Sequence, residues 1–310
     1  MRGLWRRAVV AGLAVGLDLV GVKPPTAASK RASGAGAWLA SRLGPLARAG
    51  VVGPVAMTGS AASAVAGRAL ERWGRALPEG LDLLTEALLL QALLSVEAVR
   101  AAAREVSAAL ARGDLEAARE VWRATPLLAA VPCDDLSATE MAQAATSRVA
   151  AAVNSRAVAP LFYYALGGLP AAFAYRWLCG DLLGAPQGRL GEHMRRLAMG
   201  APSWATAGLM KVAAELRRAD SLGAERVQRV EGGVLRAPAR AATVRVMAGA
   251  LDVALSDQEG NAVNTSGRAA TADDLRRAGS IAGMTVGLAG GLLMVTGLAW
   301  RVFGPHERAR

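Results

Sequence analysis

The stretch Val158–Trp177, VAPLFYYALGGLPAAFAYRW, holds all three tyrosines of the chain and two of its three phenylalanines. Within it, Ala157–Tyr175 carries no charge, and at about 1.5 Å of rise per residue this length fits a membrane-spanning helix. Gly167, Gly168 and Pro170 interrupt the stretch, and a broken helix at membrane depth needs neighbours or a water-filled cavity to satisfy its backbone. We therefore predict either a kinked span inside a bundle or a re-entrant hairpin.

Three further stretches have the composition of membrane spans. Ile281–Trp300 has no charge and ends on a tryptophan, the residue typical of the membrane interface; a buried helix of a soluble protein is the alternative. Ala49–Gly67 is uncharged but weakly hydrophobic. Ala8–Val22 is apolar apart from Asp18, and we interpret it as a retained first span rather than a signal peptide. An ionisable residue inside a span is a functional candidate, so Asp18 is a candidate for ligand binding.

The composition limits the function classes. The chain of 310 residues is 53% hydrophobic, and its formal charge is +11. The arginines occur singly or in pairs, without a dense basic run that carries interleaved aromatics, so nucleic-acid binding is not expected. Two cysteines and two histidines are too few for a zinc site of the usual spacing, so we predict no metal site of this kind. Cys133 and Cys179 favour a reducing, cytosol-facing setting without a disulfide.

The rest of the chain has helical signals. Leu81–Trp122 is predicted to be helical in two consecutive pieces, with Asp114 as an N-cap after a Gly-Asp break. Leu136–Ala152 is predicted to open with a capping box, Val212–Arg229 to form one amphipathic helix, and Thr271 to cap the helix that leads into the last span.

No stretch of any length alternates with the period of a strand, so the predicted class is all-α. We expect a polytopic integral membrane helical bundle with a cytosolic helical portion. It would form a single domain over residues 1–310, with spans near 8–22, 49–67, 157–175 and 281–300 and polar helical regions at 98–152 and 190–278.

Common catalytic motifs are absent from the sequence. It contains no phosphate-cradling GxxxxGK[ST] loop, no GxGxxG after a strand, no HExxH and no GxSxG. Asp134 and Asp135 could bind Mg²⁺ together with phosphate, although helix capping is the alternative. Chemistry alone therefore indicates a membrane protein and no particular reaction.

One resemblance covers most of the chain in the right order. ARGDLEAARE at 111–120, followed by VAPLFYYALGGLPAAFAYRW, resembles the adenosylcobinamide-phosphate synthase family of cobalamin biosynthesis, the CobD/CbiB-type membrane proteins. RAPARAATVRVMAGAL at 236–251 is similar to the family's Ser-Pro-Asn…Glu…AGAL stretch, and TADDLRRA at 271–278 resembles the helix before its last span. Leu17-Asp18 with Pro24 resembles the first span of the family.

The resemblance implies a multi-pass enzyme of the cell inner membrane. The family joins an aminopropanol, or its phosphate, to a propionate carboxyl of adenosylcobyric acid. An amide forms, with ATP and Mg²⁺ expected as cofactors and a corrinoid as substrate.

The sequence departs from the family at the polar positions that the resemblance implies. The family carries acidic residues in the helix before APLF, and Asn154 stands one place from a matching position. Asp181 nearly matches an Asp that follows the central segment in the family. An Asp-Asp pair of the family falls on GAPSWATAG at 200–208, which has no carboxylate. The other replaced positions hold Val22, Lys23, Ser147, Ala151, Ala152, Ser155, Ala237, Ala239 and Val244. The catalytic candidates are therefore Asn154 and Asp181. Arg176 joins Asp18 as a ligand-binding candidate that could meet an anion at the membrane surface, with anchoring of the span as its ordinary role.

Because apolar spans, glycines and prolines survive while ligating groups are lost, we favour a catalytically degenerate homologue, a pseudoenzyme. It would act as a partner subunit, a scaffold or a ligand holder. An active ATP- and Mg-dependent amide-forming ligase and an unrelated transporter-like bundle remain the alternatives. The active enzyme would need Asp18, Asn154 and Asp181, with Asp134 or Asp135, to meet in one polar cavity. No cofactor is expected unless the family activity is retained, and the expected partners are the lipid bilayer and a protein partner or second copy.

Overall fold

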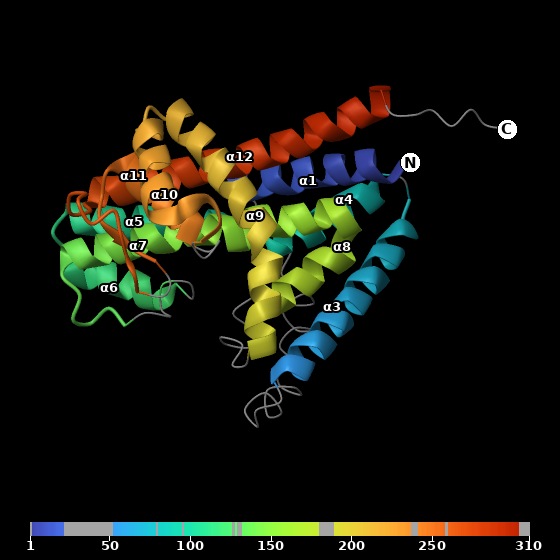
Figure 1. The fold of residues 1–310 in the computed structure, drawn as a ribbon. Coiled ribbons are helices and arrows are strands. Elements are labelled where there is room, and N and C mark those ends of the chain that lie inside the picture. The colour runs from blue at the N-terminus through green and yellow to red at the C-terminus, as the bar shows by residue number, and fades with distance from the viewer. Residues whose placement is uncertain are drawn as a thin grey trace. The chain divides into compact units, whose positions relative to one another are not determined.

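The computed structural model describes residues 2–21, 52–78, 80–94, 96–125, 128, 132–179, 189–236, 241–257 and 260–303. The chain forms two compact units (Figure 1). Unit 1 draws on residues 1–94, 160–195 and 287–310, and unit 2 on residues 95–159 and 196–286. Because each unit collects segments that are distant in sequence, the predicted single domain over 1–310 stays a prediction.

Unit 1 is built from α1 (Arg2–Val20), α3 (Val52–Arg75), α4 (Leu81–Leu93), most of α8 (Ala159–Cys179) and the last part of α12 (Ala272–Phe303). α4 packs against both α1 and α3. The predicted helix that starts at Leu81 is interrupted sooner than expected, because Leu94 has an extended backbone and ends α4.

The central stretch reverses direction inside α8. Gly168 has φ 70° and ψ −160°, a conformation open essentially to glycine alone, and Pro170 follows within the same segment. Tyr163 and Tyr175 stack with ring centroids 5.0 Å apart, although twelve residues of straight helix would separate their Cα atoms by about 18 Å. The stretch 157–175 is therefore not one straight helix but a helical hairpin, and its place in a membrane stays a prediction.

Small residues allow α1 and the last part of α12 to pack closely in unit 1. A Cβ placed on Gly290 would lie 3.0 Å from Val15 Cγ1, and one placed on Gly297 would collide with the Cβ of Ala8. Such close approach through small residues is common between helices in membranes.

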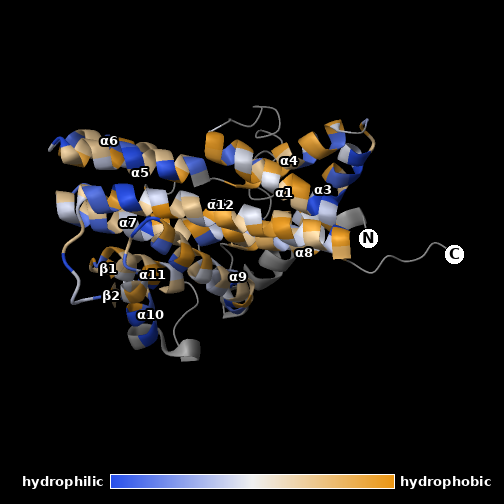
Figure 2. Cartoon of the chain, turned by 90° about the horizontal axis from the view of Figure 1, so that it is seen from above, coloured by the Kyte–Doolittle hydropathy of each residue, from blue (hydrophilic) through white to orange (hydrophobic). Residues whose placement is uncertain are grey.

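Two helical stretches, 138–179 and 272–303, are long and apolar enough to cross a membrane by length and composition alone. Figure 2 shows hydrophobic residues along α8 and α12. Only part of the most apolar stretch of α12 is buried. The second half of α12 exposes several large apolar side chains, namely Leu292, Val295, Leu298, Val302 and Phe303. The predicted spans near 8–22 and 49–67 fall on parts of α1 and α3, which do not pass the same test over the described residues, and they stay predictions.

Unit 2 holds α5 (Val96–Ala111), α6 (Leu115–Ala124), α7 (Ala138–Val153), η1 (Asn154–Val158), most of α9 (Arg189–Leu216), α10 (Ser221–Arg236), α11 (Ala242–Leu251) and the first part of α12. A two-residue ribbon of β1 (Leu255–Ser256) and β2 (Ala262–Val263) lies between α11 and α12 in the chain. β2 is too short to show an alternating pattern in the sequence, so no strand was expected here.

The predicted helix starts of unit 2 are confirmed. Asp114 accepts a hydrogen bond from Ala117 N at 3.0 Å, and Ser137 with Glu140 forms a capping box. Asp274 accepts hydrogen bonds from the backbone and hydroxyl of Thr271 at 2.9 and 2.7 Å, and also from Arg268. Burial alone would raise the pKa of Asp274, which precedes the uncharged stretch 281–300, but these hydrogen bonds hold the pKa below its ordinary value.

One boundary prediction in unit 2 is wrong. Val212–Arg229 does not form a single helix, because α9 ends at Leu216 and Arg218 adopts a left-handed backbone with φ 56°. Asp220 then accepts a hydrogen bond from Gly223 N at 2.7 Å and caps the start of α10. The amphipathic pattern continued across this turn, which explains why one helix was expected.

Candidate functional site

The catalytic candidate Asn154 lies in a buried cluster of neutral side chains in unit 2. Its side chain is 2% exposed, and its Nδ2 donates a hydrogen bond to Ser203 Oγ at 2.7 Å. Its Oδ1 accepts one from Thr206 Oγ1 at 3.0 Å. Ser203 and Thr206 are fully buried and, three residues apart on α9, lie on one face of that helix. We call Asn154, Ser203 and Thr206 the amide cluster.

Local backbone features place the amide cluster. Asn154 begins the π-helical turn η1, and π-helical insertions occur frequently at functional sites. On α9, the Thr206 hydroxyl also lies 2.7 Å from the carbonyl of Pro202, so its single proton is shared between this carbonyl and Asn154 Oδ1. Both ends of the Asn154 amide thus face hydroxyl groups of α9, and the cluster is closed by side chains of this chain.

The amide cluster lacks the groups that bind a cation tightly. Mg²⁺ is held in proteins through one or two carboxylates together with substrate phosphates, and the three side chains here are neutral. Over the part of the chain that the structure describes, no three or more His, Cys, Asp or Glu side chains gather to hold a metal ion. Val244, where the family resemblance implies a glutamate, is fully buried in α11.

A second polar network joins the hairpin of α8 to the other helices of unit 1. Glu86 on α4 is 4% exposed and accepts hydrogen bonds from Tyr164 Oη at 2.7 Å and from Arg6 Nε at 3.0 Å and Nη2 at 2.7 Å. Arg6 also pairs with Asp82, one turn earlier on α4. Arg6, Asp82, Glu86 and Tyr164 form the hairpin network.

The turn of the hairpin is held by neighbouring charges. Arg7 Nη1 donates to the carbonyls of Ala165 and Leu166 at 3.1 and 3.0 Å, which the break at Gly168 leaves without helical partners. A Cβ placed on Gly168 would lie 3.4 Å from Glu71 Oε1 and 3.6 Å from Arg7 Nη2. A side chain of α1 therefore satisfies the broken backbone, and Glu71 of α3 lies beside the turn.

The hairpin network is fully engaged by protein partners. Both carboxylate oxygens of Glu86 accept hydrogen bonds. Burial alone would raise the pKa of Asp82, but hydrogen bonds from Arg6 and from the backbone of Leu83 and Gly80 hold the pKa below its ordinary value. A metal or substrate could reach these carboxylates only by displacing Arg6, so the network supports the fold of unit 1.

The residues predicted for an active enzyme, and the ligand-binding candidate Arg176, lie on several elements of the chain. Asp18 is buried at 7% exposure on α1 and Arg176 is half-buried in the last turn of α8, both in unit 1, whereas Asn154 belongs to unit 2. Asp181 lies outside the described residues. Asp134 is exposed and pairs with Arg123 of α6. Asn154 lies within a buried cluster of matched side chains.

Sequence reasoning missed the partners in both networks. Ser203 and Thr206 were passed over because the stretch 200–208 has no carboxylate, yet their spacing places both hydroxyls on one helix face. Tyr164 was named in no predicted site, and it is a buried hydrogen-bond donor to Glu86. The sequence did contain a signal for the hairpin network in LDLLTEALLLQALL at 81–94. Asp82 and Glu86 are four residues apart there in an otherwise uncharged run, a spacing that places both on one helix face.

Comparisons with known proteins point to one family. The model of the family described as CobD/Cbib protein matches residues 11–179. The probable cobalamin biosynthesis protein CobD of Methanothermobacter thermautotrophicus is 33% identical over 100 residues, which cover 32% of this chain and 32% of that protein. The cobalamin biosynthesis protein CobD of Halalkalibacterium halodurans is 34% identical over 96 residues, which cover 31% of this chain and 29% of that protein.

The aligned stretches span about a third of the length of these curated relatives. No solved structure matches the chain. The family match contains the second half of α1, all of α3 to α8 and so the whole of the hairpin, and it covers more than half of the 310 residues. The chain therefore belongs to the CobD/CbiB protein family.

Proposed function

We propose that the chain is a membrane protein related to cobalamin biosynthesis that no longer catalyses the synthase step of its family. It would act instead as a partner subunit, a scaffold or a ligand holder. The link to cobalamin rests on the family match and on the names of the two relatives.

The observation that carries the loss of catalysis is the closed amide cluster. The family resemblance implies acidic groups next to Asn154 and along the stretch 200–208. In this chain the same two segments meet through Asn154, Ser203 and Thr206, which satisfy one another at 2.7 and 3.0 Å. Neutral hydroxyls and one amide supply no negative charge to Mg²⁺, so the cluster cannot replace a carboxylate site for ATP.

Membrane insertion has two sources of support. Two helical stretches have the length and composition of spans, and the second half of α12 exposes a row of large apolar side chains. Exposed apolar rows of this kind are unusual on soluble monomers and common on lipid-facing helices. A multi-pass arrangement in the inner membrane, with further spans near 8–22 and 49–67, is part of the proposal.

We keep Asp18 and Arg176 as the proposed ligand-binding residues. Asp18 and Arg176 carry charges within or beside apolar helices of unit 1, where an ionisable side chain usually has a functional or pairing role. An active synthase is the competing function. It would require a carboxylate site built around residues other than the amide cluster, with Asp181 as the first to mutate.

Complementation tests this proposal. The chain is expressed in a bacterial strain that lacks its adenosylcobinamide-phosphate synthase, beside an active synthase of the family in the same vector. We expect no cobalamin-dependent growth on cobyric acid from the chain alone, with the protein detected in the membrane fraction. Growth equal to that of the active synthase would overturn the loss of catalysis. Copurification of the coexpressed chain with the active synthase would support the role of partner subunit.

A further inference from the structure

Unit 2 contains a groove lined by four arginines. Arg100 and Arg104 come from α5, Arg217 from the turn after α9, and Arg276 from α12. The groove encloses about 280 Å³, and none of the described residues that line it is an aspartate or glutamate. Elements distant in the sequence thus bring four arginines to the lining of one groove, which we call the arginine groove.

The arginine groove keeps an excess of positive charge. Glu97 is shared by Arg100, at 3.0 Å, and Arg104, and Asp273 pairs with Arg276. The guanidinium of Arg217 has no hydrogen bond or ion pair with any residue that the structure describes. Two carboxylates therefore face four arginines, and two positive charges remain without a counter-charge.

Part of the groove is rigid before any ligand arrives. A Cβ placed on Gly283 would lie 2.9 Å from Cζ of Arg100, so this guanidinium rests directly on the backbone of α12. The same guanidinium pairs with Glu97 at 3.0 Å, and only 23% of the Arg100 side chain is exposed. Such a fixed guanidinium loses little conformational freedom when it binds an anion.

We propose that the arginine groove binds a phosphate group. A planar guanidinium donates two parallel hydrogen bonds to phosphate oxygens, and a phosphate carries a charge of about −1.5 to −2 near neutral pH, which matches the uncompensated charge. The enclosed volume of about 280 Å³ lies just below the range of pockets for drug-sized ligands, which favours a small phosphorylated group over a corrin ring. The groove lies wholly in unit 2, and the inference holds whether or not the chain is catalytic.

Two sources could supply the phosphate. One is a small soluble phosphate or diphosphate. The other is a phospholipid headgroup, because Gly279 and Ser280 of the groove directly precede Ile281, where the uncharged stretch of α12 begins. The same donors would serve both sources, so an experiment with two arms is needed to separate them.

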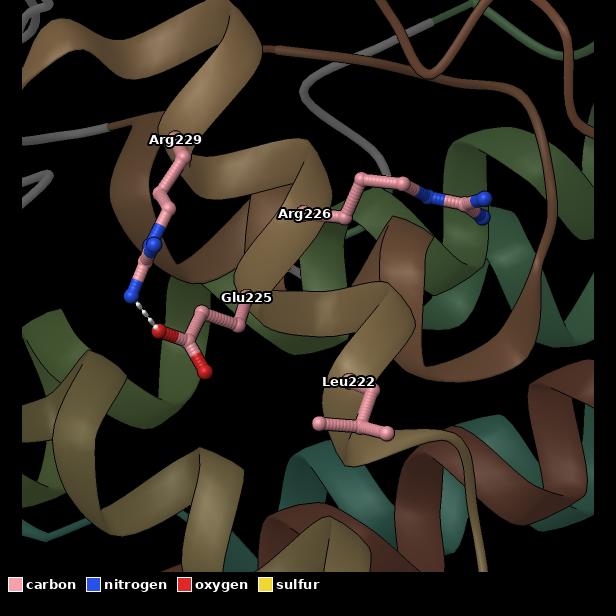
Figure 3. Close-up of a pocket in the computed structure, with 4 residues that line it drawn as sticks. All are labelled: Leu222, Glu225, Arg226 and Arg229. Carbon is pink, nitrogen blue, oxygen red and sulfur yellow. Dashed lines mark hydrogen bonds and ion pairs between the residues drawn. The ribbon is translucent and has the colours of Figure 1, made fainter.

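The surface of α10 supplies a matched control. Figure 3 shows Leu222, Glu225, Arg226 and Arg229 on this single helix, with Arg229 paired to Glu225 and Arg226 pointing away from both. Arg226, like Arg217, is exposed and unpaired within the described part of the chain. Arg226→Gln therefore removes the same charge as Arg217→Gln without touching the groove.

The test measures binding of inorganic pyrophosphate to the purified full chain by calorimetry, at low ionic strength and with acetate as a control anion. In the second arm, phosphatidylglycerol retained from mixed micelles is quantified by phosphorus content. We expect Arg217→Gln to weaken binding about tenfold in at least one arm, the loss typical of one charged hydrogen-bonding group, and Arg226→Gln to change it less than twofold. The arm that responds identifies the source. Equal effects of both variants in both arms, or no binding of either probe, would overturn the proposal.

Discussion

Glu86→Ala is expected to lower the free energy of unfolding of unit 1 by about 3 kcal/mol, because it removes one member of a buried ionic network. The Tyr164 hydroxyl, inside the unit, loses its acceptor, and an unsatisfied buried donor costs about 1–3 kcal/mol. Arg6 loses two hydrogen bonds but keeps Asp82 and is partly exposed, which limits its share of the cost.

Equilibrium unfolding of the purified protein, followed by tryptophan fluorescence, measures this effect. Glu86→Gln, which keeps an oxygen acceptor for Tyr164, is expected to lose less than half as much stability. Glu120→Ala removes an exposed glutamate of α6 and is the control for charge alone. If Glu86→Ala were as stable as Glu120→Ala, the hairpin network would not hold α8 in place.

Gly249→Ala is expected to destabilise unit 2 by about 3 kcal/mol through overpacking. α10 and α11 approach so closely that a Cβ on Gly249 would lie 2.6 Å from the Cα of Ala224 and 2.7 Å from the carbonyl carbon of Gly223. These are backbone atoms, so no side chain can rotate away and the two helices must separate. α11 has no exposed side toward which it could shift, since all of its residues are buried.

Gly208→Ala is the matched control for the loss of stability expected in Gly249→Ala. Gly208 lies on the exposed surface of α9, and a Cβ placed there would meet no atom within 4 Å. In a helix interior, alanine is more favourable than glycine by about 1 kcal/mol, so this variant is expected to gain stability. The two substitutions should thus shift the unfolding transition in opposite directions. A stabilised Gly249→Ala would show that α10 and α11 do not pack as closely as the structure has them.

Local signals in the sequence predicted the fold elements well. Asp114, Ser137 and Thr271 start helices as expected, because a capping interaction depends on residues within one turn. The break at Gly168 was also predicted, but the sequence left a kink and a hairpin open. The choice depends on Arg7 and Glu71, which lie about a hundred or more residues away in the chain.

The candidate site was only half predictable. Asn154 was named as a candidate because it stands beside a recognisable family segment, and its catalytic role stays a prediction. Ser203 and Thr206 are common helix residues whose role appears only when α9 meets η1 through their hydroxyls. The arginine groove was missed for the same reason, since scattered arginines give no local signal until α5, α12 and the turn after α9 bring them together.

The most direct test of the central claim uses the purified chain with adenosylcobyric acid, aminopropanol phosphate, ATP and Mg²⁺. Amide product and ADP are followed by mass spectrometry, and an active synthase of the family serves as the positive control. If the closed amide cluster has replaced the catalytic site, no product will form above the blank without protein, and Asn154→Ala will leave that result unchanged. Product that forms with the chain and disappears in Asn154→Ala would show that Asn154 belongs to a working active site and would contradict the loss of catalysis.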